Sequence, residues 1–118
     1  MQILNALYPV VVEDFAEYAP TVAHYRDALE LPLRAEFTHA GFHASWLGPM
    51  VVVGAPDPAA LAVARQVRGI FVVDDLDAYW RRLQPRTQVL VPPEAVPSGR
   101  RVIVRHADGR VVEYLQLG

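Results

Sequence analysis

Apolar and polar positions follow one arrangement in the first half of the chain. The stretch 3–12 is short and rich in leucine and valine, which is typical of a buried strand. Apolar residues then recur at helical spacing and predict a helix over 20–29, with Pro20 in its first turn or at a kink. Three strand-like runs separated by turns follow, over 33–39, 42–47 and 50–54.

The second half repeats this arrangement. An alanine-rich segment over 57–65 begins with Asp-Pro and predicts a short helical connector. A strand is expected over 67–73, and Asp74-Asp75 can cap a helix whose apolar stripe extends from Leu76 to Leu83. Three further strands are expected over 87–91, 100–105 and 110–117. This internal repeat predicts two βαβββ modules, 1–56 and 66–118.

Composition narrows the possible classes of protein. A chain of 118 residues, 53% of them hydrophobic, is long enough for one compact domain with its own core. The formal charge of −2 and the scattered arginines argue against a nucleic-acid-binding protein. The absence of cysteine excludes disulfides and thiolate chemistry. No signal peptide or membrane-spanning run is recognisable, so we expect a cytoplasmic protein that binds small molecules or other proteins, with no membrane partner.

One acidic residue stands out in the last predicted strand. Alternation places Val111, Glu113 and Leu115 on the same face of that strand. If this face is covered, the Glu113 carboxylate needs a partner, because an isolated buried charge costs several kcal/mol, roughly, or loses its ionisation. A metal ion, a cationic side chain or a ligand could be that partner.

Four segments in order carry a resemblance to a known family. They are VVEDF (11–15), HYRDALEL (24–31), VVDDLDAYWRRL (72–83) and HADGRVVEYLQ (106–116). Together they resemble the vicinal oxygen chelate superfamily, which includes glyoxalases, bleomycin resistance proteins and extradiol dioxygenases. The resemblance spans essentially the whole chain. It implies an α+β fold in which two βαβββ modules form cupped mixed sheets with helices on the outer face, within a single domain over 1–118.

The resemblance also implies where a metal centre would lie. Metal-dependent members hold the ion with four residues, usually His and Glu, from the first and last strands of each module. The corresponding positions here are near Leu7, with Asn5 as the nearest polar residue, then Val52 or a neighbour, Arg68 and Glu113. Three of the four are not ligand types, and one carboxylate does not hold a catalytic divalent ion. We therefore expect neither metal nor other cofactor, and predict that Arg68 pairs with Glu113.

One histidine is a candidate for the same cup. If Gly48-Pro49 makes a tight hairpin and Val52 points inward, then Ser45 and His43 point inward as well, and Trp46 faces the helix. The four histidines show no recognised metal-ligand spacing. No serine lies in a nucleophile elbow and no glycine-rich phosphate loop is present, so no catalytic residue is assigned.

These observations favour a metal-free protein of the bleomycin resistance type that binds or sequesters a small aromatic or anionic molecule, as a homodimer. The candidate ligand-binding residues are Asn5, Leu7, His43, Val52, Arg68 and Glu113. Two alternatives remain open. One is a metal-dependent lyase, isomerase or dioxygenase that uses nonstandard ligands such as His43 and Glu113. The other is an accessory protein whose cup is filled by its own side chains.

Overall fold

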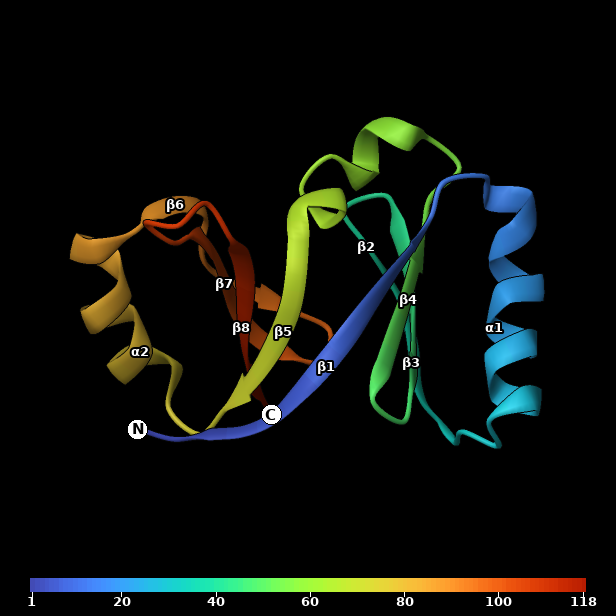
Figure 1. Ribbon diagram of the computed structural model, residues 1–118, viewed down its shortest axis with the longest axis horizontal. Helices are drawn as coiled ribbons and strands as arrows, with labels where there is room; N and C mark the ends of the chain where they lie inside the picture. Colours follow the sequence, from blue (N-terminus) through green and yellow to red (C-terminus); the bar gives the residue numbers. More distant parts are fainter. The chain divides into compact units, whose positions relative to one another are not determined.

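The architecture follows the predicted repeat of strand, helix and three strands (Figure 1). A computed structural model describes all residues, 1–118. The first module contains β1 (Ile3–Val12), the 3-10 helix η1 (Phe15–Glu17), α1 (Tyr18–Ala28), β2 (Leu33–His39), β3 (Phe42–Leu47) and β4 (Met50–Gly54). The connector holds η2 (Pro58–Leu61) and η3 (Ala64–Gln66). The second module contains β5 (Val67–Val73), α2 (Leu76–Leu83), η4 (Gln84–Arg86), β6 (Gln88–Val96), β7 (Gly99–Arg105) and β8 (Val111–Leu117). The predicted α+β class with two βαβββ modules is confirmed.

Local chemistry explains where the helices begin. α1 starts two residues before the predicted position, which places Pro20 in the first turn, where the missing N–H has no partner to lose. The Asp75 carboxylate accepts a hydrogen bond from the Ala78 amide and caps α2. The two helices are short, and no helix has the length and apolar character that crossing a bilayer requires.

β6 is the element that the sequence predicted least well. It extends to Val96 instead of ending at residue 91, and it runs through Pro92 and Pro93. Its pairing with β7 is irregular between Val91 and Glu94, where the prolines lie. Proline lacks the N–H that a regular ladder needs, and β6 tolerates it because this strand lies at the edge of its sheet.

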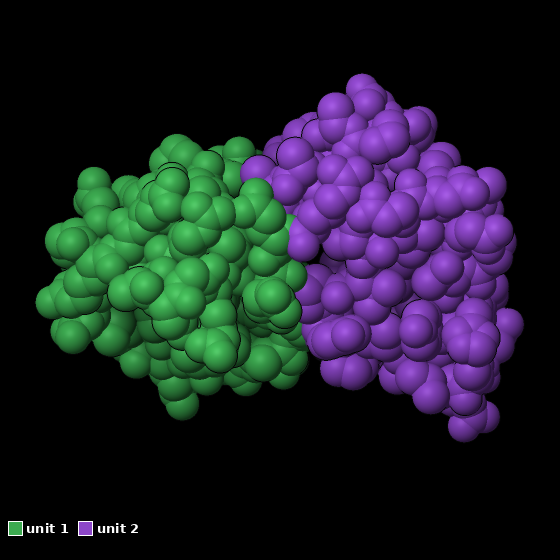
Figure 2. Space-filling view, turned by 45° about the horizontal axis from the view of Figure 1, so that its top comes forward, with its two compact units in different colours: residues 1–7, 66–118 green, residues 8–65 purple.

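The chain divides into two compact units, coloured separately in Figure 2. Unit 1 comprises residues 1–7 and 66–118, and unit 2 comprises residues 8–65. β1 contributes to both, because its first part pairs with β5 in antiparallel orientation and its second part pairs with β4 in parallel orientation. The strand order is β1-β5-β8-β7-β6 in unit 1 and β2-β3-β4-β1 in unit 2.

Each unit packs its own helix on one face of its sheet. In unit 1, α2 covers a core formed by Val73, Leu76, Val102, Val104 and Tyr114. In unit 2, α1 covers a core formed by Val12, Val22, Leu47 and Val52. The face of unit 2 opposite α1 is also apolar: Ala44, Val53 and Ala55 pack there against Leu61 of η2. Part of the connector therefore covers that face.

The predicted orientation of β3 side chains is wrong. Ser45 was expected to point away from α1, but its hydroxyl group forms a hydrogen bond with the Tyr18 hydroxyl group of that helix. Leu47 packs in the α1 core, whereas Ala44 belongs to the opposite face. Both faces of β3 and β4 are rich in apolar residues, so the alternation alone did not show which set faces the helix.

Candidate ligand-binding site

Glu113 lies in the middle of β8, on the face of the unit 1 sheet opposite α2. Its register partners are Ile70 on β5 and Ile103 on β7, and residues directly opposite each other share a sheet face. The next residue, Tyr114, points to the other side and packs in the α2 core. Leu7, which pairs with Ile70, belongs to the same face as Glu113. The acid is therefore surrounded by aliphatic side chains.

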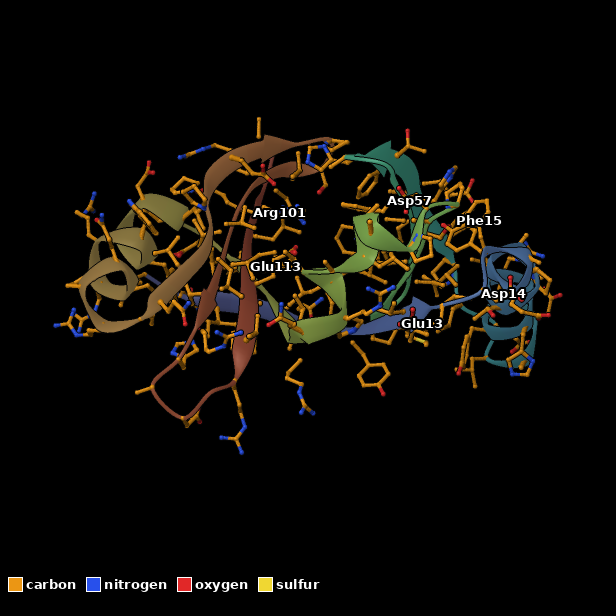
Figure 3. All side chains as sticks on the ribbon, turned by 90° about the horizontal axis from the view of Figure 1, so that it is seen from above. Glu13, Asp14, Phe15, Asp57, Arg101 and Glu113 are labelled. Atoms are coloured by element: carbon orange, nitrogen blue, oxygen red, sulfur yellow. The ribbon has the colours of Figure 1, made fainter.

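The partner of Glu113 is Arg101 of the adjacent strand β7 (Figure 3). Arg101 Nη1 donates a hydrogen bond to Glu113 Oε1 at 3.2 Å, and Arg101 Nε donates one to Glu94 Oε1 at 2.9 Å. The side chains of Arg101 and Glu113 are only 15% and 13% exposed, compared with 37% for Glu94. One largely buried guanidinium group therefore binds two carboxylates.

Burial dominates the electrostatics of this cluster. Desolvation raises the pKa of Glu113 above its ordinary value, the charge and hydrogen bond of Arg101 oppose that rise, and the Glu94 carboxylate adds to it. The second oxygen of Glu113, Oε2, accepts no hydrogen bond from the protein. Since no buried side-chain nitrogen or oxygen lacks a partner, Oε2 is not completely buried. It is an acceptor without a protein donor, among aliphatic side chains that are themselves buried.

The prediction that Arg68 pairs with Glu113 is wrong in its choice of arginine. The β5–β8 register shifts between Val67 and Gly69, so Ile70 and not Arg68 stands beside Glu113. Arg68 is exposed. The physical expectation behind the prediction holds, because a side-chain cation does neutralise the buried acid.

The remaining predicted site residues do not gather around Glu113. Leu7 is buried on the same sheet face, whereas Asn5 is exposed and its side-chain oxygen accepts a hydrogen bond from the Ala6 amide. Val52 packs in the α1 core of unit 2. His43 also lies on the α1 side, with its ring centroid 4.9 Å from that of Phe15 and 5.9 Å from that of Tyr18. The predicted inward orientation of His43 and Val52 is therefore wrong.

Sequence reasoning missed Arg101 and Glu94. Arg101 stands opposite Leu115 in the β7–β8 pairing, which makes it the diagonal neighbour of Glu113. Diagonal neighbours lie about 7–8 Å apart, within reach of an arginine side chain. The Asp108-Gly109 turn marks the hairpin in the sequence, and counting outward from it would have identified Arg101 as a candidate partner.

The residues around Glu113 do not fit the metal centre that the resemblance implies for catalytic members. Its neighbours Leu7, Ile70 and Ile103 offer no ligand atoms, and a guanidinium group already contacts the carboxylate. Zinc sites use about three protein ligands, and magnesium sites prefer several oxygens. Elsewhere, no group of three or more His, Asp or Glu side chains is placed to hold an ion.

Comparisons with known proteins identify the fold. A solved structure of a hypothetical protein from Methanosarcina mazei is 29% identical, with a TM-score of 0.83 and coverage of 100% of this chain and 95% of that chain. A glyoxalase/bleomycin resistance protein/dioxygenase superfamily member from Vibrio splendidus 12B01 is 14% identical, with a TM-score of 0.56 and coverage of 95% and 97%. The chain has the vicinal oxygen chelate fold.

The same fold occurs in a mutant of 4-hydroxymandelate synthase from Streptomyces coelicolor, at 13% identity and a TM-score of 0.59. That match covers 97% of this chain and 46% of the synthase. No protein-family model and no curated protein matches the sequence. Because a shared vicinal oxygen chelate fold does not transmit a function, the activity has to be argued from the residues of this chain.

Proposed function

We propose that this protein binds or sequesters a small organic molecule without a metal ion, on the face of the unit 1 sheet that carries Glu113. The observation on which the proposal rests is the contact between Arg101 and Glu113. At the place where a catalytic member of this fold would hold a divalent cation, a guanidinium group contacts the acid. A side-chain cation at this position supplies no Lewis acid.

The surroundings of Glu113 favour one chemistry of ligand. Leu7, Ile70 and Ile103 surround Glu113 with aliphatic side chains that are 3%, 6% and 1% exposed, and Glu113 Oε2 is an acceptor without a hydrogen bond from the protein. A largely apolar molecule with an N–H or O–H donor matches this combination. An anionic ligand, one of the two kinds of molecule predicted from the sequence, fits less well than an aromatic one, because Arg101 already contacts two carboxylates.

The proposal is tested first by elemental analysis of protein purified without chelators. We expect no stoichiometric divalent metal. Bound manganese, iron, zinc or nickel at one ion per chain that is lost in Glu113→Leu would contradict the proposal and favour the metal-dependent enzyme instead.

A second test identifies a ligand and locates it. Metabolites and antibiotics are screened by thermal shift, since a ligand selective for the folded state raises the melting temperature. The affinity of a hit is then measured by calorimetry for the wild type, for Glu113→Leu and for Glu17→Gln, a control at an exposed acid of η1. We expect Glu113→Leu to weaken binding at least about tenfold, or 1.4 kcal/mol, and the control to leave it unchanged. Equal affinities would place the ligand elsewhere.

We also propose that the protein acts as a homodimer in the cytoplasm. Leu4 and Tyr8 of β1 are 58% and 65% exposed, which is unusual for large apolar side chains in the middle of a sheet and is consistent with coverage by a second chain. Light scattering after size exclusion tests this: a single monomer mass over the micromolar range would contradict the dimer.

A further inference from the structure

Arg105, at the end of β7, differs from the other arginines of that strand and of the adjoining turn. Each of the others contacts a carboxylate: Arg100 that of Asp77, Arg101 those of Glu94 and Glu113, and Arg110 that of Asp108. Arg105 donates instead to two neutral amides. Its Nη1 lies 2.9 Å from Gln88 Oε1, and its Nη2 lies 2.6 Å from Gln66 Oε1.

These contacts hold the guanidinium group in place without neutralising it. Arg105 is half-buried, and its hydrogen bonds to the two glutamines lie at the surface of the protein. Amide oxygens carry only partial negative charge, and a partly buried cation that has no anion nearby attracts one. Two of its five N–H donors are used in the hydrogen bonds to glutamine, which leaves three for a ligand.

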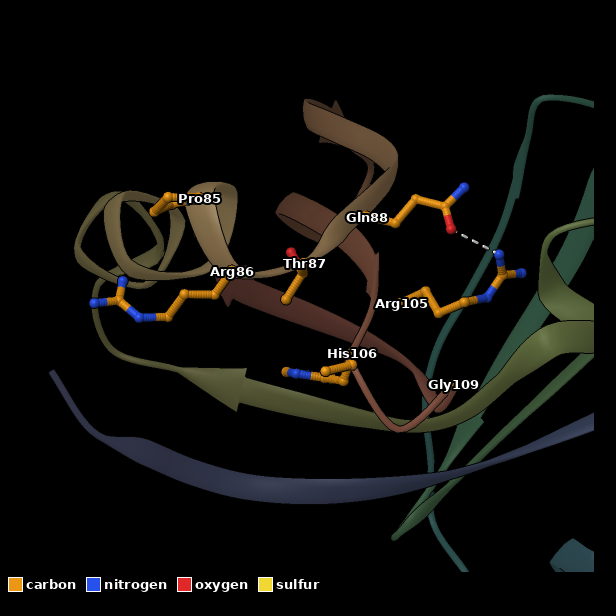
Figure 4. A pocket seen from close by; sticks show the side chains of 8 residues that line it. Pro85, Arg86, Thr87, Gln88, Arg105, His106 and Gly109 are labelled. Carbon is orange, nitrogen blue, oxygen red and sulfur yellow. Dashed lines mark hydrogen bonds between the residues drawn. The ribbon is translucent and has the colours of Figure 1, made fainter.

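Arg105 lines a shallow depression of about 390 Å³ between η4 and the β7–β8 turn (Figure 4). Arg86, Thr87, Gln88 and His106 line it as well, and none of its lining residues is acidic. The nearby acid of the turn, Asp108, forms an ion pair with Arg110. In Figure 4, His106 and Thr87 lie between two basic groups. On one side is Arg105 with its hydrogen bond to Gln88, and on the other side is the Arg86 guanidinium group.

We propose that this depression binds a small oxyanion of the phosphate type, either free or as the phosphate group of a small molecule. Arg105 provides the fixed cation, since its fork of donors matches a tetrahedral oxyanion. Arg86 is exposed, donates a hydrogen bond from Nη1 to the Arg82 carbonyl oxygen at 2.7 Å, and adds charge from the rim. The site is independent of the proposed function, because Arg105 lies four residues along β7 from Arg101, about 13 Å at roughly 3.3 Å per residue.

The experiment is a titration of the ¹⁵N-labelled protein with inorganic phosphate, followed by amide chemical shifts. Sodium chloride holds the ionic strength constant, because an exposed cation also responds to screening. We expect saturable shifts confined to residues 86–88 and 105–109. Sodium acetate at the same ionic strength should bind at least tenfold more weakly, because a carboxylate carries less charge and fewer oxygens.

Variants decide whether Arg105 is responsible. Arg105→Gln should weaken phosphate binding at least tenfold, and Arg86→Gln by two- to fivefold. Arg68→Gln, at an exposed arginine of β5 in the same unit that does not line the depression, should bind like the wild type. Phosphate shifts that persist in Arg105→Gln, or that chloride alone reproduces, would overturn the proposal. If Arg105→Gln fails to fold, an Arg86→Gln variant with unchanged affinity overturns it.

A last arm distinguishes the two sources of phosphate. Phenyl phosphate and inorganic phosphate are compared, with phenol as the neutral control. Tighter binding of the ester supports a phosphorylated small molecule, and equal binding of the two supports the free ion. Binding of phenol as tight as that of phenyl phosphate would show that the phosphate group is not recognised and would overturn the proposal.

Discussion

The two units share one order of strands and helix, but their faces opposite the helix differ. In unit 2, that face is apolar and is partly covered by Leu61 of the connector, which is fully buried. In unit 1, the corresponding face carries Arg101, Glu94 and Glu113. β4 is the last strand of its module, as β8 is of the other. On the face that corresponds to that of Glu113, β4 carries only valines, Val51 and Val53.

The difference shows that two modules can share the same order of strands and helix and still carry different side chains on the corresponding sheet face. A valine face can be closed by any apolar segment of suitable size. A face with a buried carboxylate needs a cation in a particular place, because an uncompensated buried charge costs roughly 3–5 kcal/mol. Unit 1 is therefore the half of the molecule in which a single substitution has the largest consequence.

The largest effect is expected from removing the cation of unit 1. Arg101→Met leaves Glu94 and Glu113 without their shared guanidinium, and we expect a loss of about 3–5 kcal/mol in the free energy of unfolding at pH 7.5. Urea denaturation measures it. The matched control is Arg100→Met, next in sequence, whose ion pair with Asp77 is exposed and should contribute less than about 1 kcal/mol. Equal losses in the two variants would show that the unit 1 face is not electrostatically special.

The next effect tests how tightly unit 2 packs on its helix. A Cβ atom at Gly54 would lie 2.8 Å from Tyr18 Cδ2 and 3.3 Å from Tyr18 Cβ, so Gly54→Ala must displace the start of α1. We expect a loss of about 1–3 kcal/mol, measured by thermal or urea unfolding. In unit 1, a Cβ at Gly69 meets nothing within 4 Å, so Gly69→Ala should change stability by less than about 1 kcal/mol. The reverse order would contradict the packing described for α1.

A smaller effect concerns the polar pair beneath α1. Tyr18→Phe removes the hydrogen-bond partner of Ser45, whose side chain is fully buried, and should cost about 1–2 kcal/mol. Adding Ser45→Ala should recover part of that loss, because no buried hydroxyl then lacks a partner. Tyr25→Phe on the same helix is the control and should be nearly neutral. Strict additivity of the two changes would argue against a direct Tyr18–Ser45 bond.

We expect the smallest change in stability from Glu113→Gln. It should appear in the pH dependence of the free energy of unfolding. Burial raises the pKa of Glu113, so the folded state binds its proton more tightly than the unfolded state. The wild type should therefore lose free energy of unfolding as pH rises from the ordinary glutamate range through the raised pKa. Glu113→Gln should lack that loss. Urea midpoints between pH 4 and 8 measure it, and parallel curves for the two proteins would refute a raised pKa.

The sequence predicted the elements far better than the contacts. The bounds of β2, β3, β4 and β5 agree with the predicted runs residue for residue, because turn residues and apolar runs are local signals. Glu113 was identified as an acid that needs a partner if its strand face is covered, since alternation and the cost of a buried charge suffice for that step. Its partner was not identified, because the shift in the β5–β8 register beside Arg68 has no signature in the sequence.

What the sequence determined by itself was the βαβββ repeat and the presence of one acid on an apolar strand face. The tertiary structure alone decided that Arg101 neutralises this acid and that His43 lies under α1. The physical reason is the two-residue period of a strand. A shift of one residue exchanges its faces, and only packing against the helix, or pairing with a neighbouring strand, selects between them.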